Sequence, residues 1–475
     1  MMKALFLQPP SQGGNDGGAR ARYQARREIR SFRYPTWLAQ SAALVPGSKL
    51  VDATPARIGM DTILPLAKDY DLVVMHSSQV SFSNDAKVAA ALKEQNPALK
   101  IGVVGARVAV DPAGSLETAP AIDFVGRNEF DYTIKDVAEG RAFRDIDGLS
   151  FRNAEGIIVH NAERPALEDM DRLPFVTELY RRDLKIEDYF VGHLRHPYIS
   201  FHTGRGCESL CSFCLLPQTV GGHKYRVRSA DHVAEEVAYC QKAFPQVREY
   251  FFEDDTFTDN LPRAEEIARR LGKLGVTWSC NAKANVPCDT LKVMKDNGLR
   301  LLVVGYESSC SKILHNIRKG VQIDTARHFT KDCHKLGILI HGTFILGLPG
   351  ETRESIQETI RFATEINPHT IQVSLATPYP GTRLHREATE NGWFDTADAE
   401  LTGERGVHIA PLGYPHLAHS EIYDSIETFY KSFYLRGSKI GSIVWDMIRT
   451  SGMTKWHLRE GVGFARFLSA PKSAC

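Results

Sequence analysis

The 475-residue chain has no cysteine before Cys207, and after Cys333 only Cys475 remains. It also lacks any apolar stretch of 18 residues, which a membrane-spanning helix would need. The apolar run at its start ends at Pro9-Pro10, too soon for a signal peptide. Its nine cysteines, odd in number and unevenly spaced, are not a disulfide framework. These absences predict a cytoplasmic protein, with contact at a membrane surface left open.

An excess of charge of either sign is also missing. The chain has 58 Lys and Arg against 57 Asp and Glu, a net charge of +1. Such a balance argues against wholesale nucleic-acid binding, so no nucleic-acid partner is expected. The apolar share of 43% and the charged share of 24% are those of an ordinary globular protein. The length exceeds what one hydrophobic core supports, which predicts two or three domains.

Positive charge does gather in two places. Six arginines lie between Arg20 and Arg33, with Glu28 as the one acid among them. From Phe429 to Cys475, eight Lys or Arg and many aromatic residues accompany two acids. Two interpretations stay open for these segments: packed or solvated helical faces, or a basic aromatic surface that rests on anionic lipid headgroups.

Four segments with different patterns divide the chain. Residues 1–140 alternate short apolar runs with helical patterns, which predicts a doubly wound, Rossmann-like parallel sheet. Residues 141–195 predict a connector that contains a β-hairpin. Residues 196–405 resume the alternation for six strand–helix units, typical of a partial (βα)6 TIM barrel. Residues 406–475 predict a helical C-terminal segment, so the fold class is α/β.

The expected strands follow from these runs. In the first sheet they are Lys3–Leu7, Lys49–Val51, Asp71–His76, Lys100–Val104 and Ile122–Val125. In the barrel they are Tyr198–His202, Glu249–Glu253, Thr277–Ala282, Leu301–Gly305, Ile340–Leu346 and Thr370–Ala376.

Three cysteines, Cys207, Cys211 and Cys214, lie within eight residues directly after the first expected barrel strand. Cysteine thiolates are the usual ligands of iron–sulfur clusters. Three of them leave one iron of a four-iron cluster open, and an open metal position indicates catalysis more than structure. Two other interpretations are a zinc site, with His202 or His223 as the fourth ligand, and three unconnected thiols.

The spacing C-x3-C-x2-C, with Phe213 before the last cysteine, resembles the signature of the radical S-adenosylmethionine (radical SAM) superfamily. The resemblance implies a [4Fe–4S] cluster on Cys207, Cys211 and Cys214, whose open iron chelates the amino and carboxylate groups of S-adenosylmethionine. It also implies an active site at the carboxyl ends of the barrel strands.

Further motifs follow in the order typical of that superfamily. Side chains expected to bind S-adenosylmethionine by this resemblance are Glu253, Asp254 and Asp255 for the amino group, Lys283 for the carboxylate, Glu307 and Ser308 for the ribose, and Gly347 and Gly350 on the adenine side. The three acids could instead cap a loop, and Lys283 could form a structural ion pair. Cys280 is the one candidate for a catalytic side chain that returns a hydrogen atom or an electron; an ordinary buried thiol is the other interpretation.

The N-terminal segment resembles the cobalamin-binding (B12-binding-type) domain of one branch of the superfamily. That branch often carries D-x-H-x-x-G, whereas this chain has Asp52-Ala53-Thr54-Pro55-Ala56-Arg57, without the histidine. Arg107 is expected to occupy space that the cofactor needs. We therefore expect a scaffold without cobalamin, and cobalamin binding is the alternative.

In detail the motifs resemble a hopanoid-biosynthesis group of radical SAM proteins, for example in the run Tyr23–Glu28 and in Val220–His223. This resemblance implies a hopanoid lipid substrate: the glucosamine headgroup of bacteriohopanetetrol glucosamine would contract to a cyclopentane cyclitol ether. A one-electron donor of the flavodoxin or ferredoxin type would reduce the cluster. The alternatives are a cobalamin-dependent methyltransferase and, from another class, a non-catalytic iron–sulfur electron carrier.

Overall fold

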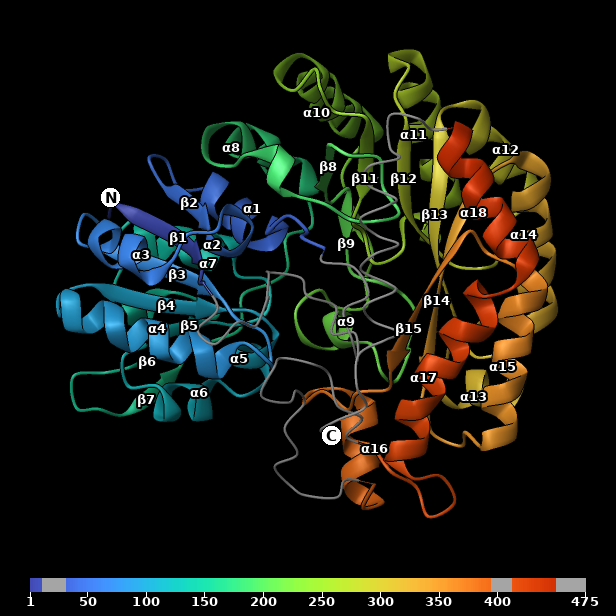
Figure 1. Ribbon diagram of the computed structural model, residues 1–475. Helices are drawn as coiled ribbons and strands as arrows, with labels where there is room; N and C mark the ends of the chain where they lie inside the picture. The colour runs from blue at the N-terminus through green and yellow to red at the C-terminus, as the bar shows by residue number, and fades with distance from the viewer. Residues whose placement is uncertain (11–30, 394–411, 450–475) are drawn as a thin grey trace.

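Two sheets, the first mostly parallel and the second wholly parallel, dominate the computed structural model, which describes residues 1–10, 31–393 and 412–449 (Figure 1). The first sheet has the order β2-β1-β3-β4-β5-β6-β7. Its strands are β1 (Ala4–Gln8), β2 (Lys49–Asp52), β3 (Leu72–His76), β4 (Lys100–Val104), β5 (Phe124–Gly126), β6 (Leu149–Arg152) and β7 (Ile158–His160). The chain leaves β1 for β2 on one side and β3 on the other, so the topological switch point lies between β1 and β3.

The hairpin β6–β7 belongs to this sheet. The sequence predicts it as part of a connector, but β6 pairs antiparallel with β5 and so continues the sheet past residue 140. Helices pack on the sheet as the doubly wound prediction requires. They are α1 (Thr36–Ala43), α2 (Ala53–Ala56), α3 (Met60–Ala67), α4 (Phe82–Gln95), α5 (Ala106–Val110), α6 (Pro112–Thr118) and α7 (Asp131–Ala138), followed by α8 (Val176–Asp183).

The second sheet is an open half-barrel of six parallel strands, which confirms the expected architecture (Figure 1). Their order is β8-β11-β12-β13-β14-β15, with β8 (Tyr198–Phe201), β11 (Glu249–Phe252), β12 (Trp278–Ala282), β13 (Leu299–Glu307), β14 (Leu339–Leu346) and β15 (Thr370–Leu375). The longer connecting helices are α10 (Ala230–Ala243), α11 (Leu261–Leu274), α12 (Cys288–Asp296), α14 (Ile323–Leu336) and α15 (Arg353–Ile366). Shorter elements are the strand pair β9 (Gly204–Arg205) and β10 (Arg226–Val227), and the helices α9 (Leu215–Thr219), α13 (Ser311–Asn316) and α16 (Arg383–Glu390).

Helix α17 (His419–Tyr434) covers the edge of the half-barrel at β15. The hydroxyl oxygens of Tyr430 and Tyr434 accept hydrogen bonds, each of 2.9 Å, from the backbone N–H groups of Val373 and Ile371. The helix therefore satisfies donors that an edge strand would otherwise leave open. This part of the basic aromatic segment packs on the barrel.

Helix α18 (Gly437–Arg449) follows α17 and leaves apolar side chains exposed. The side chains of Ile440, Ile443 and Trp445 are 46%, 38% and 59% exposed. Leu435, just before the helix, is 55% exposed. Within the described ranges, no helix is both long and apolar enough to cross a membrane.

Four buried charges join the first sheet to the loop that carries the cysteines. Arg205 donates to the carboxylates of Glu129, at 2.7 Å, and Asp131, at 2.6 Å. Arg226 donates to Glu129 at 2.6 Å. All four side chains are at most 7% exposed, and the Arg205 guanidinium lies 4.4 Å from the ring centroid of Trp37 on α1. Removing one charge from such a set leaves another buried without its partner.

We expect Arg205→Met to lower the free energy of unfolding by about 3–5 kcal/mol, because Asp131 then loses its arginine in a buried setting. Urea denaturation measures this. The matched control is Arg269→Met: Arg269 is 56% exposed and pairs with Glu265 along α11, so a loss of about 0.5 kcal/mol or less is expected. Equal losses for the two variants would contradict the structural role of the network.

Candidate active site

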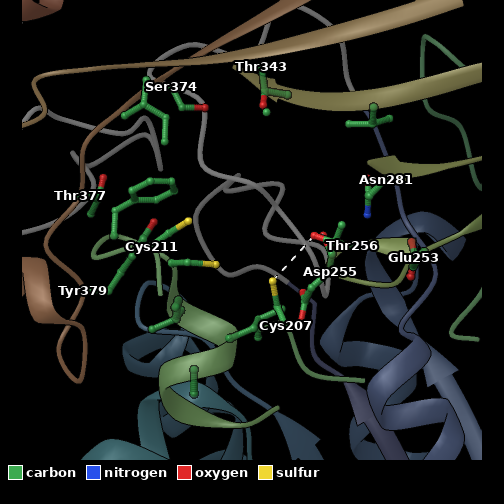
Figure 2. Close-up of a pocket in the computed structure, with 18 of the residues that line it drawn as sticks. Cys207, Cys211, Glu253, Asp255, Thr256, Asn281, Thr343, Ser374, Thr377 and Tyr379 are labelled. Carbon is green, nitrogen blue, oxygen red and sulfur yellow. Dashed lines mark hydrogen bonds between the residues drawn. The ribbon is translucent and has the colours of Figure 1, made fainter. Parts of the chain in front are cut away.

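A cavity of about 460 Å³ opens between the carboxyl ends of the two sheets, where α/β folds place their ligands. Figure 2 shows Cys207 and Cys211 pointing into it, with Glu253 and Asp255 on one side and Ser374, Thr377 and Tyr379 on the other. Cys214 also lines it. The structure therefore brings the three predicted cluster ligands into one cavity.

The loop that carries the cysteines is held by backbone contacts. Gly206 has φ +89°, and a Cβ there would lie 2.2 Å from the carbonyl oxygen of Lys224, so only glycine fits this turn. The N–H of Cys207 then donates to the Gly222 carbonyl at 3.3 Å, and the N–H of Ser212 donates to Ile317 at 3.0 Å. These contacts position the thiols before any metal binds.

The chemistry of the three thiols fits an iron–sulfur cluster. They are reduced, and burial, together with neighbouring Asp255 and the other thiols, raises the pKa of Cys214 well above its ordinary value. Burial also raises the pKa of Cys211. Thiols become stable as thiolates when a cationic metal core lies beside them.

A zinc site is not supported by the geometry. Among the residues that the structure describes, no three His, Cys, Asp or Glu side chains converge on a single-ion position. His223 Nδ1 lies 3.2 Å from the Cys207 carbonyl oxygen, and His202 packs its ring against Trp37.

The acidic run after β11 divides between two faces. Glu253 and Asp255 line the cavity. The Thr36 hydroxyl holds Glu253 at 2.9 Å. Asp254 is fully buried on the opposite face, where its carboxylate accepts from the backbone and hydroxyl of Thr203 and from the Tyr225 hydroxyl, each at 2.6 Å. The Asp254 side chain therefore braces β8 against the loop after β11, and its predicted contact with the cofactor stays a prediction.

Glu307 lies at the cavity end of β13, and Ser308 does not. A register shift between Gly305 and Glu307 and a φ of +65° at Glu307 turn its carboxylate into the cavity. Ser308 is completely buried, and its hydroxyl lies 3.4 Å from that of Thr359 on α15. Glu307 is therefore placed for the predicted ribose contact, whereas Ser308 does not line the cavity.

Two lysines bring positive charge to the cavity. Lys283 pairs with Asp259 at 2.6 Å, and Asp259 Oδ2 lies 3.7 Å from Cys207 Sγ. Sequence reasoning missed Lys319, which pairs with Glu307 at 2.7 Å and also lines the cavity. Burial acts to lower the pKa of Lys319, but Glu307 and the nearby thiols outweigh it, so the pKa is raised.

The glycine-rich loop after β14 does not face the cavity. Gly347 and Gly350 have φ of +83° and +87°, but the space beside them is filled by Ile422 and Asn316. Glu351 folds back beneath the loop to accept from the backbone N–H of Gly347, and burial raises its pKa to about 8. The glycines thus shape a turn that does not line the cavity, and their predicted contact with the adenine side stays a prediction.

Cys280 is sealed within the barrel wall. Its side chain is completely buried in the hydrophobic core, it does not line the cavity, and burial raises its pKa well above the ordinary range. Nothing in this position brings Cys280 to a substrate in the cavity, and its catalytic role stays a prediction. Asn281 and Ala282 of β12, and Lys283 after it, line the cavity instead.

The first sheet contributes its own wall to the cavity, through His76, Ser77, Gln79 and Ala106 among others. His76 ends β3, beside the switch point. The sequence did not single it out, because it lies outside the D-x-H-x-x-G pattern. Asp52, the start of that pattern here, is buried away from the cavity and accepts from the Tyr189 hydroxyl at 3.0 Å.

Arg107 was expected to occupy space that the cofactor needs, but it does not line the cavity. Its guanidinium lies over the Phe82 ring at 5.3 Å and 3.3 Å from the Asp111 carboxylate. The cavity is therefore open at the end of β4.

Comparison with known proteins agrees with this geometry. Residues 201–363 match the model of the Radical SAM superfamily. A relative from Pyrococcus horikoshii, called an uncharacterized methyltransferase (PH0819), is 28% identical over 92% of this chain and 93% of its own length. The hopanoid C-3 methylase of Methylococcus capsulatus is 27% identical over 45% of this chain and 40% of its own length.

Solved structures share the fold. The radical S-adenosylmethionine methyltransferase TsrM from Kitasatospora setae, with cobalamin and a [4Fe–4S] cluster bound, has a TM-score of 0.64, with 14% identity over 90% of this chain and 82% of that one. The cobalamin-dependent radical enzyme OxsB, with aqua-cobalamin and S-adenosylmethionine bound, has a TM-score of 0.66, with 14% identity over 86% of this chain and 64% of that one.

The half-barrel, the three clustered thiols and the family match together define a radical SAM superfamily domain. Residues 201–363 therefore form a radical SAM domain, which implies a [4Fe–4S] cluster and S-adenosylmethionine as cofactors.

We expect Glu307→Ala to weaken S-adenosylmethionine binding about tenfold or more, since a hydrogen bond to a charged group contributes roughly 1.5–3 kcal/mol. Calorimetry on protein with its cluster assembled measures the affinity. Asp254→Asn is the matched control: it should lower the free energy of unfolding but change the affinity less. A larger loss of affinity in Asp254→Asn than in Glu307→Ala would contradict the division of the acids described above.

Proposed function

We propose that this enzyme cleaves S-adenosylmethionine reductively and uses the resulting 5′-deoxyadenosyl radical to abstract a hydrogen atom from a substrate in the same cavity. The observation that carries the proposal is the meeting of three reduced thiols with Glu253, Asp255 and Glu307 in one cavity at the strand ends. A cluster held by the three thiolates would supply the electron for the cleavage.

The chain's own residues would bind and orient the cofactor. Cys207, Cys211 and Cys214 would hold the cluster. Glu253 and Asp255 lie where carboxylates can accept from an ammonium group, and Glu307 lies where a carboxylate can accept from two vicinal hydroxyls. Lys283 and Lys319 would offset the negative charge of these groups.

The cysteine variants test this function. Cys207→Ala, Cys211→Ala and Cys214→Ala should each abolish 5′-deoxyadenosine formation after anaerobic reconstitution and reduction, because each removes one of three cluster ligands. Cys288→Ala, an exposed cysteine outside the cavity, is the matched control and should keep the activity. A rate of 5′-deoxyadenosine formation near that of the unmutated protein, in any one of the Cys207, Cys211 or Cys214 variants, would reject the cluster assignment. Iron bound without any cleavage in the unmutated protein would favour an electron carrier.

For the substrate, we propose the headgroup of a hopanoid lipid, with ring contraction of a glucosamine headgroup to a cyclitol ether as the reaction. The sequence resemblance to hopanoid-biosynthesis proteins supports this, as does similarity to a hopanoid C-3 methylase. The cavity wall opposite Glu253 is polar, with Ser374, Thr377 and Tyr379, which suits a hydroxylated ring (Figure 2).

A second candidate function is cobalamin-dependent methyl transfer. The observation in its favour is the opening of the cavity onto the ends of β3 and β4, with Arg107 turned away. The methyltransferase name of the Pyrococcus relative points the same way. The D-x-H-x-x-G motif, whose histidine would bind the cobalt, is absent from residues 52–57. Cobalamin content after anaerobic purification, and S-adenosylhomocysteine as a product, would favour methyl transfer over ring contraction.

A lipid substrate also requires access to a membrane surface. We expect the protein to bind anionic liposomes reversibly and more weakly at higher salt, through α18 with its exposed Ile440, Ile443 and Trp445. The matched variant Ile443→Ser with Trp445→Ser should reduce cosedimentation. No binding to anionic liposomes even at low salt would reject membrane contact and leave this segment as a cap. Most of the arginine run, and the chain beyond Arg449, lie outside the described residues.

A further inference from the structure

Glu307 and Lys319 reach the cavity through two unusual backbone positions. Glu307 and Arg318 are both non-glycine residues with positive φ, +65° and +56°. Such conformations are unfavourable for residues with a side chain and persist where the surrounding structure requires them. Here the first turns the carboxylate inward from β13, and the second precedes Lys319 in the loop after α13. Two strained positions therefore deliver one ion pair to one point.

That point lies beside a predicted cluster ligand. The carbonyl oxygen of Arg318 is 3.9 Å from Cys211 Sγ, and the carbonyl of Ile317 accepts from Ser212 in the cysteine loop. Lys319 Nζ and Glu307 Oε1 are 2.7 Å apart, with side chains only 12% and 6% exposed. A Cβ on Gly305 would lie 2.7 Å from Lys319 Nζ, so the glycine leaves room for the ammonium.

The charge around the thiols makes this ammonium significant. Glu253, Asp255 and Glu307 line the cavity, and Asp259 lies beside Cys207. Lys283 pairs with Asp259, so Lys319 is one of two lysines among these four acids. Three thiolates outweigh the positive charge of an oxidised four-iron core, and adding an electron makes the cluster more negative still. Net charge near a cluster is one of the factors that set its reduction potential. A buried cation at this point favours the reduced state.

We propose that Lys319 is a positioning residue that raises the reduction potential of the cluster, and that Glu307 opposes this effect while holding the lysine in place. This inference rests on the proposed function, since it requires the cluster on Cys207, Cys211 and Cys214. The electron comes from an external one-electron donor, no bond is formed or broken in this step, and no proton moves. Nothing in the known role of a ribose-binding carboxylate requires a lysine partner.

The test is a potentiometric titration, followed by electron paramagnetic resonance, on reconstituted full-length protein without S-adenosylmethionine. Lys319→Met should shift the reduction equilibrium at least tenfold toward the oxidised cluster, which is about 59 mV for one electron. Glu307→Gln should shift it in the opposite direction, and the double variant should lie between the two. Lys319→Arg, which keeps the charge, should stay close to the unmutated protein.

Lys292→Met is the matched control, because Lys292 is 63% exposed in a surface pair with Asp296 on α12. It should not change the potential. If Lys319→Met fails to assemble a cluster, Lys319→Arg and Glu307→Gln still decide the question. Potentials that do not move, or that move in the same direction in Lys319→Met and Glu307→Gln, would overturn the inference. An unmutated protein that assembles no cluster would instead contradict the proposed function.

Discussion

The cavity exists because a buried charge network holds the cysteine loop against the first sheet. Arg205 lies two residues before Cys207, and its guanidinium is shared between Glu129 and Asp131 at the start of α7. This network acts together with the apolar core that Tyr34 and Trp37 share with β8, and with the hydrogen bond from the Tyr34 hydroxyl to the Tyr198 carbonyl. These contacts set the cysteine loop and the wall at His76 on one cavity.

The architecture could be predicted from the sequence because apolar residues recur with a different period in strands and in helices. Every expected strand is present, with bounds within one or two residues of those predicted. The same periodicity could have separated the acids correctly. Residues 253 and 255 share one side of an extended chain and residue 254 the other, so Asp254 was the least suitable of the three for a cavity. The motif resemblance treated the three as a unit, whereas the structure shows that alternation decides their roles.

Other features of the site cannot be predicted from the sequence around them. Lys319 reaches Glu307 only because Arg318 adopts a left-handed conformation, which neither a motif nor a hydrophobic pattern predicts. The glycines of the loop after β14 have the composition of a ligand-binding turn, but Ile422 of α17, over 70 residues later, fills the space beside Gly347. Arg107 was misjudged for the same reason, since its position depends on the Phe82 ring of another helix.

The tyrosine hydroxyls of α17 have a consequence for how the half-barrel ends. A sheet that stops at β15 could recruit a further strand, from its own chain or from another molecule. Tyr430 and Tyr434 occupy the donors of Val373 and Ile371 with side-chain oxygens, which match a strand's acceptors without extending the sheet. The barrel is thereby kept at six strands and prevented from closing. One side of the cavity is therefore bounded by the chain after β15 and by the first sheet, through residues such as Thr377 and His76, and not by further barrel strands.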